Sequence, residues 1–219
     1  MDGSGRWAKR HGVAVSEGHR EGTRALRRTV EAAIDVGVET LAVFAFSTEN
    51  WTRPSDEVAD LMEIFSETID REFPDLSRQG VRTRFFGRRD RVPPDLLTKM
   101  SELESQTASN GRLNLWVAFD YGGRGELVEA ARRLVEEDVA ADAVDELAIS
   151  TRLYAPELDG LDLLIRTSGE FRISNFMLWE AAYAELVFTE TLWPDFGEAD
   201  LLQAIDEFAR RQRRFGGRE

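Results

Sequence analysis

The chain has 219 residues, which is enough for one domain with a buried core and too few for two domains of ordinary size. It contains no cysteine and only two histidines, so disulfides, thiolate metal sites, cysteine nucleophiles and multi-histidine metal centres are excluded. The net charge of −13 argues against a nucleic-acid partner, and because no apolar run reaches the roughly 18 residues of a membrane helix, we expect a cytoplasmic protein with no transmembrane segment.

Helical and strand-like spacings of apolar residues alternate along the chain. Helical spacing predicts helices over 26–34, 58–69, 96–103, 127–135, 175–182 and 201–208, with Ser55 as the N-cap of the second. Short apolar runs predict strands over 40–46, 81–86, 113–119, 161–165 and 185–189. Because helices separate the strands, we expect crossover connections. The predicted fold is α/β, a single domain over 1–219 with a central, mainly parallel sheet flanked by helices.

Polar and small residues collect in four segments, 2–7 (DGSGRW), 46–54 (FSTENWTRP), 120–124 (DYGGR) and 166–175 (RTSGEFRISN). The last three follow predicted strands, and ligands of parallel α/β sheets bind beyond the carboxyl ends of strands. Each segment combines small residues with an arginine or a carboxylate, which favours capture of phosphate or diphosphate by backbone amides and guanidinium groups. The alternative is four ordinary turns with solvated arginines.

Other phosphate-binding and hydrolytic motifs do not fit. Residues 3–8 match G-x-G-x-x-A, but no strand precedes them as a dinucleotide site requires. The sequence has no P-loop, no G-x-S-x-G elbow and no D-D-x-x-D run. Nucleoside triphosphate hydrolysis and serine hydrolysis are therefore disfavoured.

In chain order, MDGSGRWAKR, FSTENWTRP, DYGGR, IRTSGEFRISNF and LWEAAYAEL with LWPDF resemble the characteristic blocks of the cis-prenyltransferases, the family of undecaprenyl diphosphate synthase-like isoprenyl transferases. This resemblance implies a Mg²⁺-dependent enzyme that condenses isopentenyl diphosphate sequentially onto an allylic diphosphate such as farnesyl diphosphate, giving a medium-length polyprenyl diphosphate. It also implies a homodimer, and a lipid product delivered to the membrane by an enzyme in the cytoplasm or at the inner membrane face.

The resemblance further implies roles for individual residues. Asp2 and Asn50 are the expected catalytic residues, and Asp2 and Glu185 are the expected carboxylate ligands of Mg²⁺, a cation that prefers carboxylate and phosphate oxygens. The residues expected to bind substrate are Gly3, Ser4, Gly5, Arg6, Trp7, His19, Phe46, Ser47, Glu49, Trp51, Arg53, the isopentenyl diphosphate clamp Arg166, Arg172 and Ser174, and Arg214 and Gly216, which reach the site of the other subunit.

The chain departs from the family pattern at several positions. Ser4 stands where asparagine is usual, Val15 where an arginine is common, and Phe171 where a histidine is common. The chain begins at Met1 without the strand that normally leads into the first block, and we expect that strand to be encoded upstream. Two other function classes stay open, a non-catalytic subunit of a prenyltransferase complex and another diphosphate- or nucleotide-binding α/β protein.

Product length in such an enzyme depends on the apolar tunnel that holds the growing chain. Ala45 is small at a position where a bulky side chain would close the tunnel early, which favours a medium-length product. Large aromatic side chains would shorten the product if they point inward, and the candidates are Phe85, Phe86, Trp116 and Phe119.

Overall fold

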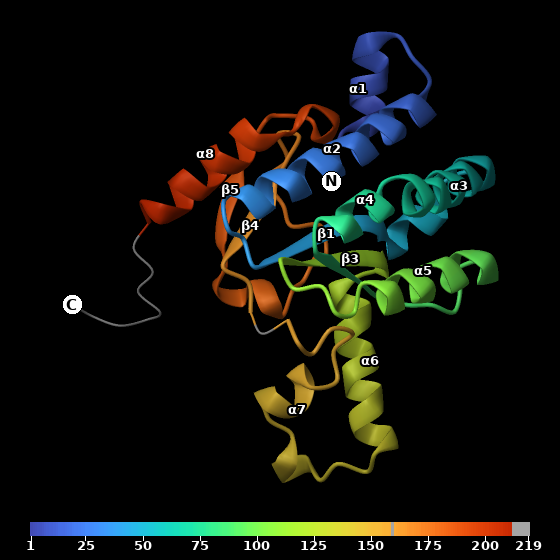
Figure 1. Cartoon of the computed structure of the whole chain (residues 1–219). Coiled ribbons are helices and arrows are strands. Elements are labelled where there is room, and N and C mark those ends of the chain that lie inside the picture. Colours follow the sequence, from blue (N-terminus) through green and yellow to red (C-terminus); the bar gives the residue numbers. More distant parts are fainter. Residues whose placement is uncertain (159, 212–219) are drawn as a thin grey trace.

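The computed structural model describes residues 1–158 and 160–211, and its helices and strands alternate along the chain (Figure 1). The helices are α1 (Ser4–His11), α2 (Val15–Asp35), α3 (Ser55–Arg71), α4 (Phe73–Arg78), α5 (Pro94–Gln106), α6 (Gly123–Glu136), α7 (Glu146–Ser150) and α8 (Glu198–Ala209). The strands are β1 (Thr40–Ser47), β2 (Val81–Phe86), β3 (Leu113–Tyr121), β4 (Leu163–Arg166) and β5 (Glu185–Phe188). Short 3-10 turns are η1 (Thr48–Thr52), η2 (Ala141–Ala143), η3 (Glu180–Tyr183) and η4 (Trp193–Asp195).

All strand pairs in the described part of the chain are parallel, which requires a long crossover connection between paired strands. One group has the order β1-β3-β2, and β4 and β5 form a second, separate pair. The predicted α/β fold with parallel strands flanked by helices is confirmed, and each predicted strand is present. The strands nevertheless hydrogen-bond as two groups rather than as one continuous sheet.

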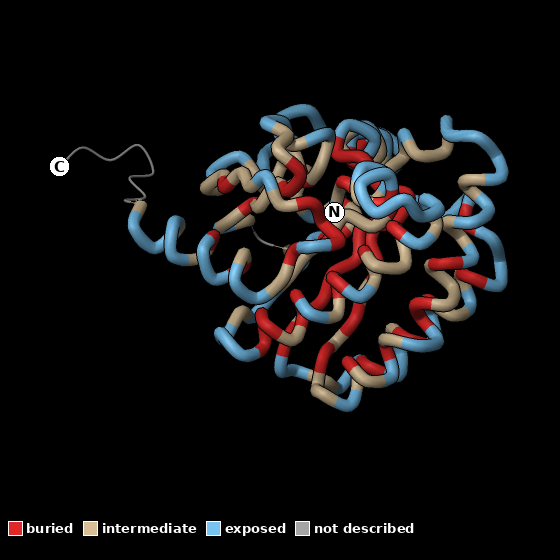
Figure 2. The backbone as a smooth tube through the Cα atoms, turned by 90° about the horizontal axis from the view of Figure 1, so that it is seen from above, coloured by how far each residue is buried: buried red, intermediate tan, exposed pale blue. Residues whose placement is uncertain are grey.

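The two faces of the three-stranded sheet are covered differently. Alternate residues of β3 at 113, 115, 117 and 119 join a large apolar core with α2, α3, α4 and α5. Trp116, Ala118 and Tyr121 point to the other face, where Tyr154 and Met177 from irregular segments pack on them. Figure 2 shows the buried residues running through the centre of the molecule, with exposed residues on the outer sides of the helices. Helices therefore cover one face, and the segments around 154–158 and 176–177 contribute to the cover of the other.

α2, at 21 residues, places its apolar side against the sheet and its charged side outward. Its buried residues recur at helical spacing, with Ala25, Leu26, Thr29, Val30 and Ala33 among them. Neither α2 nor any other helix within residues 1–158 and 160–211 has the length and apolar content to cross a membrane.

Three local predictions were wrong. No helix was predicted in segment 2–7, but α1 begins at Ser4. The predicted helix over 175–182 is reduced to η3, because Asn175 (φ +64°) and Met177 (φ +45°) have left-handed backbone conformations that interrupt a helix. Ser55 is the first residue of α3 rather than its cap, which is Pro54.

Candidate active site

The start of α1 has a backbone conformation that favours glycine. Gly3 has a φ of +99°, and a Cβ atom there would lie only 2.5 Å from Ser168 Oγ. The Gly3 N–H donates to Asp2 Oδ1 at 2.6 Å. The amides of residues 4–6 precede the first intrahelical hydrogen bonds, and no atom lies within 4 Å of the Cβ position of Gly5. This helix start is suited to an anion, because free N–H groups and the positive end of the helix dipole meet there.

Asp2 is held between two distant parts of the chain. Its carbonyl accepts a hydrogen bond from Ser168 Oγ at 2.6 Å and another from Trp193 N–H at 2.9 Å. Ser168 is buried, follows β4 by two residues and has a φ of +77°. These bonds bring the first segment, the loop after β4 and η4 to one place.

Five charged side chains there form a row of alternating sign, which we call the charge row: Arg166, Asp2, Arg6, Glu170 and Arg172. Arg166 Nη2 donates to Asp2 Oδ2 at 2.9 Å, and Arg6 Nη2 lies 3.5 Å from the same oxygen. Arg6 Nη2 also lies 3.4 Å from Glu170 Oε1, and Arg172 Nη1 donates to Glu170 Oε2 at 2.5 Å. Three guanidinium groups and two carboxylates leave a net charge of +1 in a chain whose total charge is −13.

Arg166 is the most buried member of the charge row, with 15% of its side chain exposed. Its Nε is buried and has no hydrogen-bond partner among the described residues. A buried donor without a partner is costly and is expected to be completed by a ligand or by water. Arg166 therefore retains one donor for an anion while it holds Asp2.

The turn η1 follows β1 and carries the second group of predicted residues. Asn50 Oδ1 accepts the Ser47 N–H at 2.9 Å, so the Asn50 side chain closes the turn. Glu49 Oε1 accepts Asn175 Nδ2 at 2.9 Å, which ties η1 to the loop after β4. The turn after β1 and the loop after β4 are therefore in direct contact.

Trp51 and Phe46 form an aromatic wall at the end of β1. Trp51 packs edge-on against Phe46, and Phe46 stacks on Phe119 of β3 at 5.3 Å between ring centroids. Trp51 Nε1 donates to the buried Asp120 carboxylate at 2.8 Å, and the Arg91 guanidinium binds the same carboxylate at 2.5 Å. The wall is therefore fixed by the buried Asp120 carboxylate, which Arg91 neutralises, as well as by packing.

His19 lies on α2, close to the charges of Arg53 and Glu57. Burial lowers the pKa of His19, the Arg53 guanidinium lowers it further, and Glu57 opposes the shift. Its Nε2 is buried without a hydrogen-bond partner within the described part of the chain. Arg53 itself pairs with Glu57 at 2.8 Å. A neutral imidazole here has one ring nitrogen ready for a ligand.

Other predicted residues lie elsewhere. Trp7 donates through Nε1 to Asp195 at 2.7 Å and stacks on His11, so it contacts η4. Ser174 is exposed in the loop after β4, with a φ of +50°. Arg214 and Gly216 lie outside the described residues.

Glu185 is not brought to Asp2 within one chain. It starts β5 and pairs in register with Leu163, whereas Arg166 pairs with Phe188. Three residues of strand correspond to about 10 Å, so Glu185 lies at the opposite end of the β4–β5 pair from Arg166. Its carboxylate binds Arg211 at 2.8 Å.

The carboxylate that suits a metal ion here is Asp2. Among the described residues, no group of three or more histidine, aspartate or glutamate side chains is close enough to hold a cation without further ligands. Asp2 is 39% exposed and lies beside the guanidinium groups of Arg6 and Arg166, a type of group that is suited to phosphate. Mg²⁺ is commonly held by one or two carboxylates with substrate phosphates and water, so this single carboxylate fits a cation that arrives with a diphosphate.

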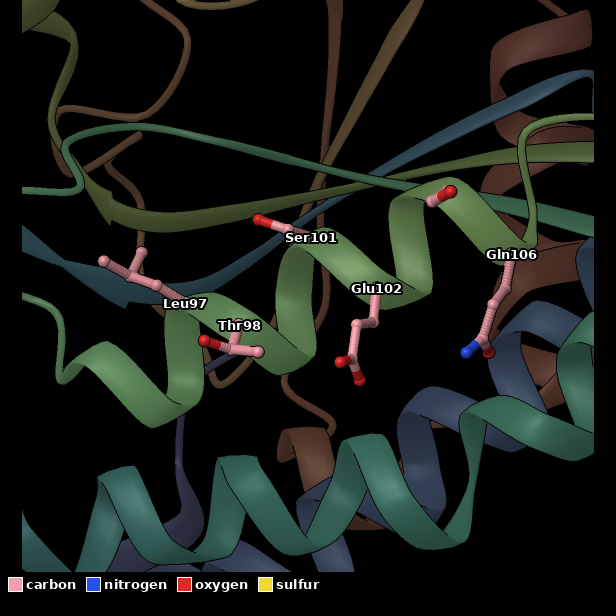
Figure 3. A pocket seen from close by; sticks show the side chains of 6 residues that line it. Leu97, Thr98, Ser101, Glu102 and Gln106 are labelled. Carbon is pink, nitrogen blue, oxygen red and sulfur yellow. The ribbon is translucent and has the colours of Figure 1, made fainter.

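A separate cavity of about 540 Å³ lies beside α5, far along the chain from the charge row. Figure 3 shows Thr98, Glu102 and Gln106 of α5 directed toward the space in front of a neighbouring helix. Its lining holds hydroxyl, amide, carboxylate and apolar groups and no cationic side chain. This cavity does not fit a diphosphate.

Several residues of the site were missed by sequence reasoning. Ser168 and Glu170 belong to the charge-row region, Asn175 joins two loops, and Asp120 anchors Trp51. All four lie inside the segments singled out from the sequence, so the sequence predicted where they belong but not what they contact. The sequence offered one signal for such a role: Glu170 is a carboxylate between arginines of the same segment, where an ion pair is expected.

The chain is similar to known proteins over nearly its whole length. The family model described as putative undecaprenyl diphosphate synthase matches residues 1–216. A ditrans,polycis-undecaprenyl-diphosphate synthase from Xanthomonas axonopodis pv. citri is 49% identical over 99% of this chain and 86% of its own length. An isoprenyl transferase from Thermotoga maritima is 46% identical over 99% of this chain and 94% of its own length.

Solved structures show the same likeness. Lavandulyl diphosphate synthase from Lavandula x intermedia, crystallised with dimethylallyl diphosphate, superposes with a TM-score of 0.94 at 36% identity, covering 99% of this chain and 95% of that one. A probable undecaprenyl diphosphate synthase from Campylobacter jejuni superposes with a TM-score of 0.81 at 32% identity, covering 90% and 92%.

Proposed function

The chain belongs to the undecaprenyl diphosphate synthase family and is a cis-prenyltransferase enzyme, and from this premise we propose that it condenses isopentenyl diphosphate sequentially onto an allylic diphosphate in a Mg²⁺-dependent reaction. The observation that carries the proposal is the charge row beside the start of α1. Three guanidinium groups and a set of free helix amides lie at one place, beside a single exposed carboxylate. Two diphosphate groups need such a concentration of donors.

The two substrates are assigned to neighbouring parts of the site. The amides of residues 4–6, with Arg6 and His19, would hold the allylic diphosphate, whose departure from the allylic carbon starts the reaction. Arg166, Arg172 and Ser174 would hold isopentenyl diphosphate, so that its double bond faces that carbon. A new carbon–carbon bond forms, the allylic diphosphate leaves with the bonding electron pair, and a proton is lost from C2 of the isopentenyl unit.

Asn50 is proposed to orient the group that takes this C2 proton. A neutral amide is a weak base, and Asn50 Oδ1 is already occupied by the Ser47 N–H. Its amide can still fix a water molecule or a diphosphate oxygen beside the reacting carbon.

Asp2 is proposed to hold Mg²⁺ together with diphosphate oxygens. When bound, the cation would neutralise negative charge that develops on the leaving diphosphate. Glu185 binds Arg211 at the opposite end of the β4–β5 pair from Arg166, so it would have to leave Arg211 and move toward Asp2 to reach such a metal.

The apolar chain of the substrate is proposed to lie on the α3 side of the sheet. Ala45, Phe46 and Trp51 all contact the core on that face. Phe85 and Phe119 belong to the same core, whereas Phe86 and Trp116 belong to the opposite face and would not narrow a channel there. We therefore retain a medium-length polyprenyl diphosphate, delivered to the membrane, as the proposed product.

We also propose a homodimer in which Arg214 and Gly216 complete the site of the partner subunit. Both residues lie outside the described part of the chain, so the support for this step is the resemblance of their segment, RRFGG, to the family pattern. Sedimentation equilibrium would show two copies per particle if the proposal is correct. A monomer at assay concentration that retains full activity would contradict it.

The direct test incubates labelled isopentenyl diphosphate and farnesyl diphosphate with and without Mg²⁺ and sizes the extracted lipid. We expect Mg²⁺-dependent transfer of label to the organic phase, and a loss of at least a hundredfold in Arg166→Ala. Arg71→Ala is the matched control, because Arg71 is 71% exposed on α3. Label that stays in the aqueous phase would favour the non-catalytic subunit, and stabilisation by NAD(P) or nucleoside triphosphates alone would favour another phosphate-binding function.

A further inference from the structure

Asn175 is placed where three segments of the site meet. Its Nδ2 donates to Glu49 Oε1 of η1 at 2.9 Å, and its Oδ1 accepts the Arg124 N–H at 2.8 Å. Its carbonyl accepts the Gly123 N–H at 2.8 Å. One residue thus connects η1, the start of α6 and the loop after β4.

The orientation of this side-chain amide follows from its partners. A backbone N–H can only donate, so the atom that faces Arg124 must be Oδ1. Partial burial favours a higher pKa for Glu49, but several hydrogen bonds, the strongest from Asn175, together outweigh it and lower the pKa. The ionised Glu49 can only accept, which places Nδ2 on its side.

The backbone at this point is shaped for the same contact. Asn175 has a φ of +64°, a conformation that asparagine tolerates better than most residues. A Cβ atom on Gly122 would lie 2.8 Å from Asn175 Nδ2 and 2.6 Å from Thr48 Oγ1, so the glycine leaves room for both side chains in their present positions. The backbone of Asn175 and the absence of a side chain at Gly122 therefore both favour this contact.

We propose that Asn175 is a positioning residue that sets the distance between the clamp residues Arg172 and Ser174 and the turn that carries Asn50. The inference rests on the proposed function, which places isopentenyl diphosphate at the clamp and the allylic chain at η1. Asn175 follows Ser174 directly and bonds Glu49, which precedes Asn50 directly. A shift of the reacting atoms by about 1 Å lowers the rate strongly, so the contact governs turnover more than the binding of either substrate alone.

Two substitutions separate the parts of the contact. Asn175→Asp keeps the oxygen that accepts the Arg124 N–H but puts a second carboxylate against Glu49. Asn175→Gly removes both side-chain bonds while suiting the positive φ. We expect either variant to lower kcat at least tenfold, with less than a twofold change in the Kd of farnesyl diphosphate or isopentenyl diphosphate measured separately by calorimetry.

A rescue tests the contact itself. In the double variant with Glu49→Gln, the side-chain amide introduced at position 49 can donate to the carboxylate at 175, which restores the bond with donor and acceptor exchanged. Asn175→Asp should then cost less than threefold in kcat relative to Glu49→Gln alone. An equal loss in both backgrounds, or unchanged kcat in Asn175→Asp, would overturn the inference.

A second measurement does not depend on turnover. Hydrogen–deuterium exchange should be at least fivefold faster in peptides covering 47–54 and 120–126 of Asn175→Gly than in the native chain, with core peptides from β2 unchanged as evidence of folding. Unchanged exchange in both site peptides would refute the link between the segments. Absence of lipid product in the native chain would contradict the proposed function, and the exchange result would still decide the role of Asn175.

Discussion

Replacing Glu180 by glutamine is expected to change how the stability of the protein depends on pH. Glu180 begins η3, is 5% exposed, and has both carboxylate oxygens buried without a hydrogen-bond partner in the described structure. Burial raises the pKa of Glu180 from its ordinary 4.5 to about 7, and the nearby Glu126 carboxylate contributes to this rise. Glu126 is itself buried, where it accepts hydrogen bonds from the Tyr121 hydroxyl and from the Tyr154 N–H.

The sign follows from proton binding. Between pH 4.5 and about 7 the folded chain holds a proton on Glu180 that the unfolded chain has lost, so the free energy of unfolding falls as pH rises through this window. Each pH unit is worth about 1.4 kcal/mol, so the full penalty is about 3 kcal/mol, present above pH 7 and absent below pH 4.5. Glutamine cannot ionise and does not incur this penalty.

Urea unfolding of the native chain and Glu180→Gln at half-unit steps from pH 4.5 to 8.5 measures the effect. The difference in unfolding free energy between the two proteins should shift in favour of the variant by about 3 kcal/mol across the window and then level off. Glu190→Gln, at an exposed position, is the control and should run parallel to the native chain. A constant difference between Glu180→Gln and the native chain would refute the assignment of a protonated Glu180.

Further predictions concern the site. Gly3→Ala should lower stability by roughly 1–3 kcal/mol in thermal unfolding, because its Cβ would meet Ser168 Oγ at a φ of +99°; an unchanged Tm would contradict this. Gly5→Ala should not lower the Tm, since nothing lies near its Cβ position and alanine is the better helix former, yet it should raise the KM for farnesyl diphosphate because the methyl group fills the proposed anion site; an unaltered KM would move that site elsewhere. Ala45→Leu should shorten the lipid products on thin-layer chromatography, and the same product lengths as the native enzyme would show that the tunnel does not pass Ala45. Pyrophosphate should raise the lowered pKa of His19 in an NMR titration, with His19→Gln used for assignment, and an unmoved titration would exclude contact between them.

The strands could be predicted because short, continuous apolar runs are typical of buried parallel strands. The runs around β1 and β3 are apolar at nearly every position, as expected where both faces of a parallel strand are buried. The start of α1 gave no such signal, since its glycines and serine are poor helix formers. It is held by contacts distant in sequence, such as Trp193 N–H to the Asp2 carbonyl and Trp7 to Asp195.

The candidate site also has features that the sequence predicted and features that it did not. The grouping of Asp2, Arg6 and Arg166 followed from selecting segments rich in small and charged residues. The roles of Asn175 and Glu180 could not be read from sequence, because one depends on a left-handed backbone that brings three loops together and the other on burial without partners. Strand register also decides against Glu185 as a neighbour of Asp2 in one chain, and apolar spacing contains no information on register across strands.

The charge row has a consequence for what happens when substrates arrive and leave. Asp2 and Glu170 already pair with the three arginines of the row. Under the proposed function, substrate capture would exchange these carboxylates for phosphate oxygens, with little rearrangement of the guanidinium groups. After each release the two acids would pair with the arginines again, which would keep like charges from repelling one another between rounds of chain extension.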